Sequence, residues 1–141
     1  MSEWWQWSPK QATDGVGFAV VGIGRFGSAV CRELISNGAE VLAVDSSEKA
    51  IEELRQLEPS IEARVVDSTD EESMREAGVL EMGTVVVGIS EPIEASITTT
   101  LIAKDSDGSR VRQVIARATS DLHEKMLKRV GADRVVFPSR M

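Results

Sequence analysis

The feature that most constrains the fold of this chain is a regular alternation of short apolar runs with longer amphipathic segments from residue 16 onward. We predict six strands, at residues 18–23, 40–44, 63–66, 84–89, 113–116 and 134–137. The runs at 18–23, 84–89 and 113–116 are nearly continuous in apolar residues, as expected for strands buried on both faces. Strands that alternate with helical segments are typical of a parallel sheet covered by helices.

Capping and stop signals divide the intervals into five predicted helices. The first spans 25–37 and stops at Gly38, and the second spans 47–57 and ends before Pro59. The third is short, is capped by Ser68 or Thr69 and ends at Gly78. The fourth has Pro92 as its first residue, and the fifth spans 120–130 with Ser120 as its N-cap.

Length and composition narrow the class of protein. The chain has 141 residues, 42% of them hydrophobic, which is enough for one domain with its own core. Its single cysteine, Cys31, excludes an internal disulfide and favours a reducing compartment. A net charge of −7 argues against binding to nucleic acid. The first residues lack the basic start and apolar stretch of a signal peptide, so we expect none, and no apolar run is long enough to span a membrane.

A glycine pattern, Gly22-Ile23-Gly24-Arg25-Phe26-Gly27, falls where the first predicted strand meets the first predicted helix. In that context the first glycine permits a tight turn and the second lets the backbone approach a pyrophosphate. The third glycine allows close packing of the helix on the strand. The helix N-terminus then faces the negative charge of the ligand.

Asp45 strengthens this interpretation because it ends the second predicted strand, 18 residues after Gly27. A carboxylate at that position accepts hydrogen bonds from ribose hydroxyls and repels a 2′-phosphate. Together the two features predict a Rossmann-like, doubly wound α/β fold with six parallel strands in the order 3-2-1-4-5-6.

The predicted site lies at the carboxyl ends of the strands, where ligands bind in such sheets. Asp67 follows the third strand, although this residue is also interpreted as a possible helix cap. We expect the following residues to bind the cofactor: Gly22, Ile23, Gly24, Arg25, Phe26, Gly27, Asp45, Ser46, Asp67, Ser68, Gly88, Ile89, Ser90 and Arg117.

Catalytic motifs are missing from the sequence. It has no tyrosine and a single histidine, His123, predicted inside the last helix rather than after a strand. It also has no phosphate-binding Gly-x-x-x-x-Gly-Lys-Ser/Thr loop, no cysteine pair for zinc and no Gly-x-Ser-x-Gly elbow. We therefore predict a domain that binds without catalysis, with no catalytic residue and no metal ligand.

Several segments resemble the Ktr/Trk-type regulatory subunits of potassium uptake systems. They are Val21-Gly-Ile-Gly-Arg-Phe-Gly-Ser, Val41-Leu-Ala-Val-Asp45, Asp67-Ser-Thr, Val85-Val-Val-Gly-Ile-Ser, and the stretch from His123 to Pro138. The resemblance implies an RCK or KTN (TrkA-N) domain that binds ATP, ADP or NAD(H). It further implies dimers within an octameric ring on the cytoplasmic side of a membrane potassium channel or transporter.

Carried over by position, the resemblance implies that Gly22, Gly24 and Gly27 form the phosphate-binding loop and that Arg25 is the arginine of that loop. Asp45 would hold the ribose. Asp67, Ser68 and Thr69 stand in place of an Asp-Ala-Thr segment near the adenine, with serine for alanine. Arg117 takes the place of a basic residue that faces the nucleotide.

The resemblance also divides the chain. Residues 1–15, with Trp4, Trp5 and Trp7, are interpreted as an arm, residues 16–138 as the nucleotide-binding domain, and residues 139–141 as the start of a linker to a further region. Two alternatives stay open. One is the cofactor-binding domain of an NAD-dependent oxidoreductase, and the other is an interaction module with a Rossmann fold and no ligand.

Overall fold

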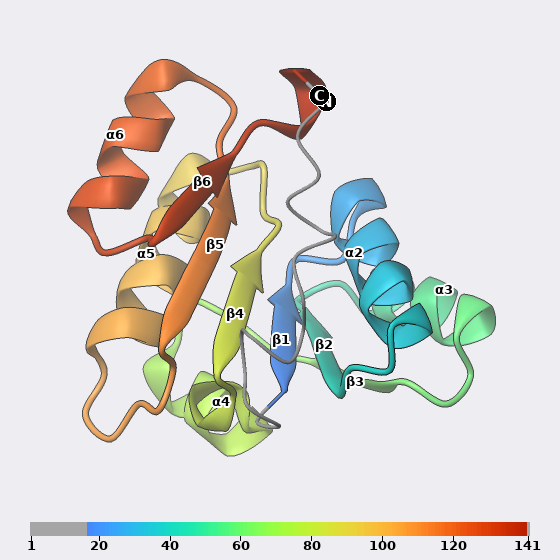
Figure 1. The fold of residues 1–141 in the computed structure, drawn as a ribbon. Helices are drawn as coiled ribbons and strands as arrows, with labels where there is room; N and C mark the ends of the chain where they lie inside the picture. Colours follow the sequence, from blue (N-terminus) through green and yellow to red (C-terminus); the bar gives the residue numbers. More distant parts are fainter. Residues whose placement is uncertain (1–16, 141) are drawn as a thin grey trace.

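The computed structural model describes residues 17–140, which form a six-stranded sheet between two layers of helices (Figure 1). All strand pairs are parallel, and the sheet is doubly wound. The predicted arm and its three tryptophans lie outside the described residues.

The elements follow one another as the alternation of the sequence predicts. The strands are β1 (Phe18–Val21), β2 (Val41–Asp45), β3 (Glu62–Val65), β4 (Thr84–Val87), β5 (Gln113–Arg117) and β6 (Arg134–Val136). The helices are α2 (Arg25–Ser36), α3 (Glu48–Leu57), α4 (Glu71–Ala77), α5 (Ile93–Asp105) and α6 (Asp121–Arg129), with short 3₁₀ turns at Val79–Glu81 and Pro138–Arg140. The strand order β3-β2-β1-β4-β5-β6 confirms the predicted fold.

Two apolar cores lie on opposite faces of the sheet, because successive side chains of a strand point to opposite sides. In β1, Phe18 and Val20 pack with α2 and α3, whereas Ala19 and Val21 pack with α4, α5 and α6. Figure 1 shows the corresponding helices on the two sides of the sheet. This burial on both faces explains why β1 and β4 are fully apolar or buried along their length.

The helix termini confirm part of the capping prediction and correct the rest. Ser120 caps α6 by accepting a hydrogen bond from the N–H of His123, and Gly78 ends α4 with a positive φ of 94°. The N-cap of α4 is Asp70, not Ser68 or Thr69, since its carboxylate accepts from the N–H of Ser73. Pro92 is the N-cap of α5 rather than its first helical residue.

Helix α5 buries a polar face. Its buried side chains are Ser96, Thr99, Thr100 and Ala103, while Leu101 is 45% exposed. On α6 the buried residues are His123 and Leu127, while Leu122 is 66% exposed and Met126 is also exposed. Some of the large apolar side chains of these two helices therefore lie on the surface. Within residues 17–140, no helix combines the length and apolarity needed to cross a membrane.

Candidate functional site

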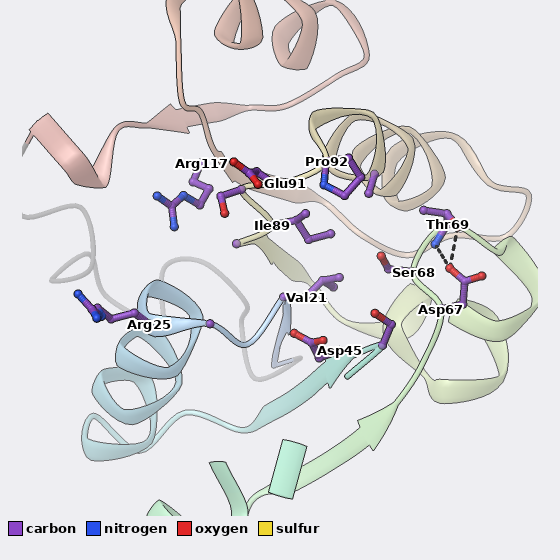
Figure 2. A pocket seen from close by; sticks show the side chains of 16 residues that line it. Val21, Arg25, Asp45, Asp67, Ser68, Thr69, Ile89, Glu91, Pro92 and Arg117 are labelled. Carbon is purple, nitrogen blue, oxygen red and sulfur yellow. Dashed lines mark hydrogen bonds between the residues drawn. The ribbon is translucent and has the colours of Figure 1, made fainter. Parts of the chain in front are cut away.

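A cavity of about 650 Å³ opens at the carboxyl ends of the strands. Its wall comes from the residues that end or follow the first five strands (Figure 2). The volume falls within the roughly 300–1,000 Å³ that is usual for small-molecule sites. The predicted residues that line it are Gly22, Gly24, Arg25, Asp45, Ser46, Asp67, Ser68, Gly88, Ile89, Ser90 and Arg117.

Three predicted residues, Ile23, Phe26 and Gly27, do not line the cavity. Five residues that do were not among the predicted cofactor-binding residues, although the resemblance had placed Thr69 near the adenine. These five are Val21, Thr69, Glu91, Pro92 and Ala95. Val21, Thr69 and Glu91 adjoin predicted residues in the sequence, and Pro92 follows Glu91, so the length of each loop at the strand ends would have indicated them. Ala95 lies in the first turn of α5, and its exposure to the cavity depends on how that helix packs.

Backbone conformation and packing within the protein, without any ligand, require glycine at the first and third positions of the pattern. Gly22 has a φ of +95°, and a Cβ there would come within 2.8 Å of the backbone nitrogen of Ile89. A Cβ on Gly27 would lie 2.0 Å from the carbonyl oxygen of Gly22, which is a severe overlap. Hence this turn and the start of α2 are packed against each other and against the loop after β4.

Gly24 differs, because a Cβ at this position would meet no protein atom within 4 Å. Its φ of −92° is also open to any residue. Gly24 is the N-cap of α2 and provides no side-chain cap, and the first turn contains no acidic residue. The N-terminus of α2, which begins at the cavity with Gly24 and Arg25, therefore has no side-chain cap from Gly24 and no acidic side chain in its first turn, and helix ends of this kind bind anions.

Asp45 connects two of the loops. Its Oδ2 accepts a hydrogen bond of 2.6 Å from the N–H of Ile23, and its Oδ1 accepts one of 2.7 Å from the N–H of Ser47. Ile23 thus contributes through its backbone although its side chain is buried. Each carboxylate oxygen has a further lone pair, so Asp45 is still able to accept hydrogen bonds from a ligand.

Asp67 organises the turn after β3 rather than a helix end. Its Oδ1 accepts hydrogen bonds from Thr69 Oγ1 at 2.6 Å and from the Thr69 N–H at 2.9 Å. The same two bonds lower the pKa of the Asp67 carboxyl. The alternative interpretation of Asp67 as a helix cap is wrong, since Asp70 has that place. Ser68 is tied to α5, because its Oγ accepts a 2.8 Å hydrogen bond from Thr99 Oγ1.

Arg117, the last residue of β5, lies with its guanidinium carbon 5.3 Å from the ring centroid of Phe26. Burial lowers the pKa of Arg117, and its Nε is buried without a hydrogen-bond partner among the described residues. Arg25 comes from the first turn of α2 and is exposed. Figure 2 shows these two arginines at the left, Asp45 near the centre and Asp67 at the right.

His123 is buried and does not line the cavity. Its Nδ1 accepts a hydrogen bond of 3.1 Å from the N–H of Thr119, so Nδ1 carries no proton. The proton is therefore on Nε2, which lies 2.7 Å from Ser96 Oγ and donates to it. Burial, with Arg117 as a second cause, lowers the pKa of His123.

Among residues 17–140, the side chains that line the cavity offer carboxylates, hydroxyls and two guanidinium groups, and they include no histidine, lysine, cysteine or tyrosine. Cys31 lies in α2 and faces the core, where burial and the charge of Glu58 raise the pKa of its thiol to about 12. Within the part of the chain that the structure describes, no cluster of three or more His, Cys, Asp or Glu side chains is arranged to hold a metal ion.

Comparison with known proteins gives a match to the TrkA-N domain over residues 18–138. The chain is 41% identical over 123 residues to the Ktr system potassium uptake protein C of Bacillus subtilis, covering 87% of this chain and 53% of that protein. It is 35% identical to the Ktr system potassium uptake protein A of the same organism, with the same coverage of both chains. The chain therefore spans about half the length of these curated relatives.

Solved structures support the same fold. The NAD(P)-binding domain of an exopolyphosphatase-related protein from Archaeoglobus fulgidus superposes with a TM-score of 0.75 at 26% identity, over 89% of this chain and 90% of that one. The GsuK channel bound to NAD gives a TM-score of 0.72 at 18% identity, over 85% of this chain and 21% of the other. GsuK bound to ADP gives 0.71 at 21% identity, over 96% and 34%.

Proposed function

Because this chain belongs to the TrkA-N domain family, we propose that it is a regulatory domain of a potassium uptake system, and that it senses adenine nucleotides or NAD(H). In this role the domain converts occupancy of the cavity into a change in a partner, and the nucleotide leaves unaltered.

The observation that carries the proposal is the pairing of Gly24 with Asp45 on adjacent loops of one cavity. Gly24 presents bare backbone and the uncapped end of α2, which suits a phosphate group. Asp45 presents carboxylate oxygens, which suit the two hydroxyls of a ribose. A nucleotide joins these two chemical groups in one molecule.

The arginines extend the phosphate end of the proposed site. The Nε of Arg117 is a buried donor without a partner among residues 17–140, and a ligand oxygen would satisfy it. Arg25 reaches the same cavity from the helix that follows the glycines. Phosphate groups and guanidinium groups form charge-assisted hydrogen bonds, so a ligand with two or more phosphates fits this end.

The proposed ligand class is a nucleotide with a free ribose. ATP, ADP, NAD⁺ and NADH all meet that condition, and the negative charge of Asp45 disfavours a 2′-phosphate. GsuK, a structural neighbour, is known with NAD and with ADP, which is in keeping with a site that accepts both.

A thermal-shift panel with ATP, ADP, NAD⁺ and NADH tests the proposal. A ligand that binds only the folded state raises the melting temperature. At a ligand concentration of one hundred times the Kd, the added free energy of unfolding is about 2.7 kcal/mol. At least one of the four is expected to raise the melting temperature in a saturable way. No shift with any of them at millimolar concentration would overturn the proposal.

The partners belong to the proposal as well. We propose that the longer protein forms a homodimer, and an octameric ring, on the cytoplasmic face of a membrane potassium transporter. The Ktr relatives, named as potassium uptake proteins, support this assignment. The alternative of an oxidoreductase cofactor domain requires an acid or base beside the nicotinamide, and a steady NADH signal with candidate carbonyl substrates would weigh against it.

A further inference from the structure

His123 is the only histidine of the sequence, and its ring joins two segments that build the cavity wall. The side chain is fully buried and is not among the residues that line the cavity. Neither the proposed nucleotide contacts nor the fold prediction assigns this residue a role.

The first segment is the loop that follows β5. His123 Nδ1 accepts from the N–H of Thr119, at 3.1 Å. Thr119 comes two residues after Arg117, whose side chain lines the cavity and lies over Phe26. The ring therefore holds the chain immediately beyond Arg117.

The second segment is the start of α5. His123 Nε2 donates to Ser96 Oγ at 2.7 Å, and this hydroxyl donates in turn to the carbonyl oxygen of Ile93 at 2.9 Å. Ile93 directly follows Pro92, and Ser96 directly follows Ala95; Pro92 and Ala95 both line the cavity. One neutral imidazole thus bridges two sides of the proposed site.

We propose that His123 is a positioning residue for this cavity, whose neutral ring keeps the Arg117 side and the α5 side in register, and that protonation of the ring weakens nucleotide binding. The proposal rests on the proposed function and adds to it a response to acid.

Protonation disrupts the bridge for a geometric reason. A proton on Nδ1 would point at the N–H of Thr119, so that two donors face each other and the acceptor is lost. The Thr119 hydroxyl also lies near Nδ1, but its distance of 3.4 Å is too long for a strong replacement hydrogen bond. Thr119 and Ser96, the groups that contact the ring from the loop and from α5, are uncharged. The charged group that acts on the ring is Arg117, on β5, and its positive charge opposes a second one. A positive ring is therefore expected to separate the two segments.

Nuclear magnetic resonance on the whole chain tests the proposal directly, because a single histidine gives one set of imidazole signals. NAD⁺ is the probe, since its doubly esterified diphosphate keeps its charge through the titration. The pKa of His123 is expected to be lower with saturating NAD⁺ than without it. By linkage, the Kd for NAD⁺ must then rise on acidification, approaching tenfold per pH unit once the free protein is fully protonated.

Three variants separate positioning from stability. In His123→Gln, we expect weaker NAD⁺ binding at neutral pH and no further change in Kd on acidification. Ser96→Ala removes the α5 end of the bridge and is expected to weaken binding as well. Thr100→Val is the matched control, because this substitution removes a buried hydroxyl that is bonded to the Ser96 carbonyl and leaves the contacts of the His123 ring in place. The control variant should keep the pH dependence of the native chain.

The outcomes are distinguishable. If NAD⁺ binds but the pKa of His123 is the same with and without it, the positioning role is wrong while the proposed function stands. If neither NAD⁺ nor an adenine nucleotide binds at neutral pH, the proposed function fails and the role of His123 fails with it.

Discussion

The backbone N–H of Ile23 donates a 2.6 Å hydrogen bond to Oδ2 of Asp45, across 22 positions of the sequence. This bond fixes the glycine turn after β1 to the end of β2. The same carboxylate holds the N–H of Ser47, the N-cap of α3, through its other oxygen. The proposed ribose acceptor is therefore held rigidly relative to the proposed phosphate site.

Replacing Asp45 with alanine is expected to weaken the binding of every ligand that has a free ribose. A lost charge-assisted hydrogen bond costs about 1.5–3 kcal/mol, which is roughly a 10- to 150-fold rise in Kd. Because Asp45 also holds two backbone groups, the melting temperature without ligand should fall too. Calorimetric titration below the melting temperature separates the two effects, and an unchanged Kd in the folded variant would remove Asp45 from the site.

Gly24→Ala and Gly27→Ala form a matched pair with opposite expectations. Gly24→Ala meets no protein atom within 4 Å, so the free energy of unfolding should change by no more than about 1 kcal/mol while nucleotide affinity falls. Gly27→Ala places a Cβ 2.0 Å from the Gly22 carbonyl oxygen and should destabilise the fold by about 3 kcal/mol or more. Urea denaturation and ligand titration of both variants check this. Full affinity in Gly24→Ala would contradict close approach of a ligand there.

Arg25→Ala tests whether this exposed arginine distinguishes ligands by their number of phosphates. A contact to the terminal phosphate predicts a larger loss of affinity for ATP than for ADP, and such a difference is what shifts a conformational equilibrium. Titration of the variant with both nucleotides measures the two ratios. Equal losses would make Arg25 a general phosphate contact.

Stability should fall on mild acidification because of His123. Its folded-state pKa is lowered, while the unfolded chain has the ordinary value of about 6.5. Below that pH the unfolded chain binds a proton that the folded chain does not, so the free energy of unfolding decreases. The free energy of unfolding falls with a slope that approaches about 1.4 kcal/mol per pH unit, and the fall stops below the pKa of His123 in the folded state. Denaturation between about pH 7 and pH 5, with His123→Gln as control, measures it; identical slopes would contradict the assignment.

Self-association is expected through α5 and α6, around Ile93, Ile97, Leu101, Leu122 and Met126. The structure leaves Leu122 and Leu101 largely exposed, and exposed apolar side chains on neighbouring helices favour an interface. Light scattering should give about twice the monomer mass of 15.3 kDa, and Leu122→Asp should restore the monomer. A monomer for the native chain at high concentration would oppose this prediction.

The fold could be predicted because local signals agree with one another along the chain. Each buried strand is a short apolar run, and glycines or caps end most helices. The loops at the strand ends bring together Gly24, Asp45 and Asp67, as the rule for parallel sheets predicts.

Side-chain packing was the part that the sequence did not determine. Apolar residues recur four apart in α5 at Ile93, Ile97 and Leu101, yet the helix buries Ser96, Thr99 and Thr100. Their hydroxyls donate to the helix backbone or to Ser68, and the Ser96 hydroxyl also accepts from His123. Asp67 and Asp70 are both of a residue type that suits a helix N-cap, and only the geometry of the turn decides which of them caps α4.

The most direct measurement is a pair of calorimetric titrations, with NAD⁺ and with NADP⁺, on the native chain. The two ligands differ only in the 2′-phosphate that Asp45 is expected to repel. We expect saturable binding of one NAD⁺ per chain and at least about tenfold weaker binding of NADP⁺, the equivalent of 1.4 kcal/mol. Equal affinity for both ligands, or binding of NADP⁺ alone, would contradict a cavity in which Asp45 holds a free ribose.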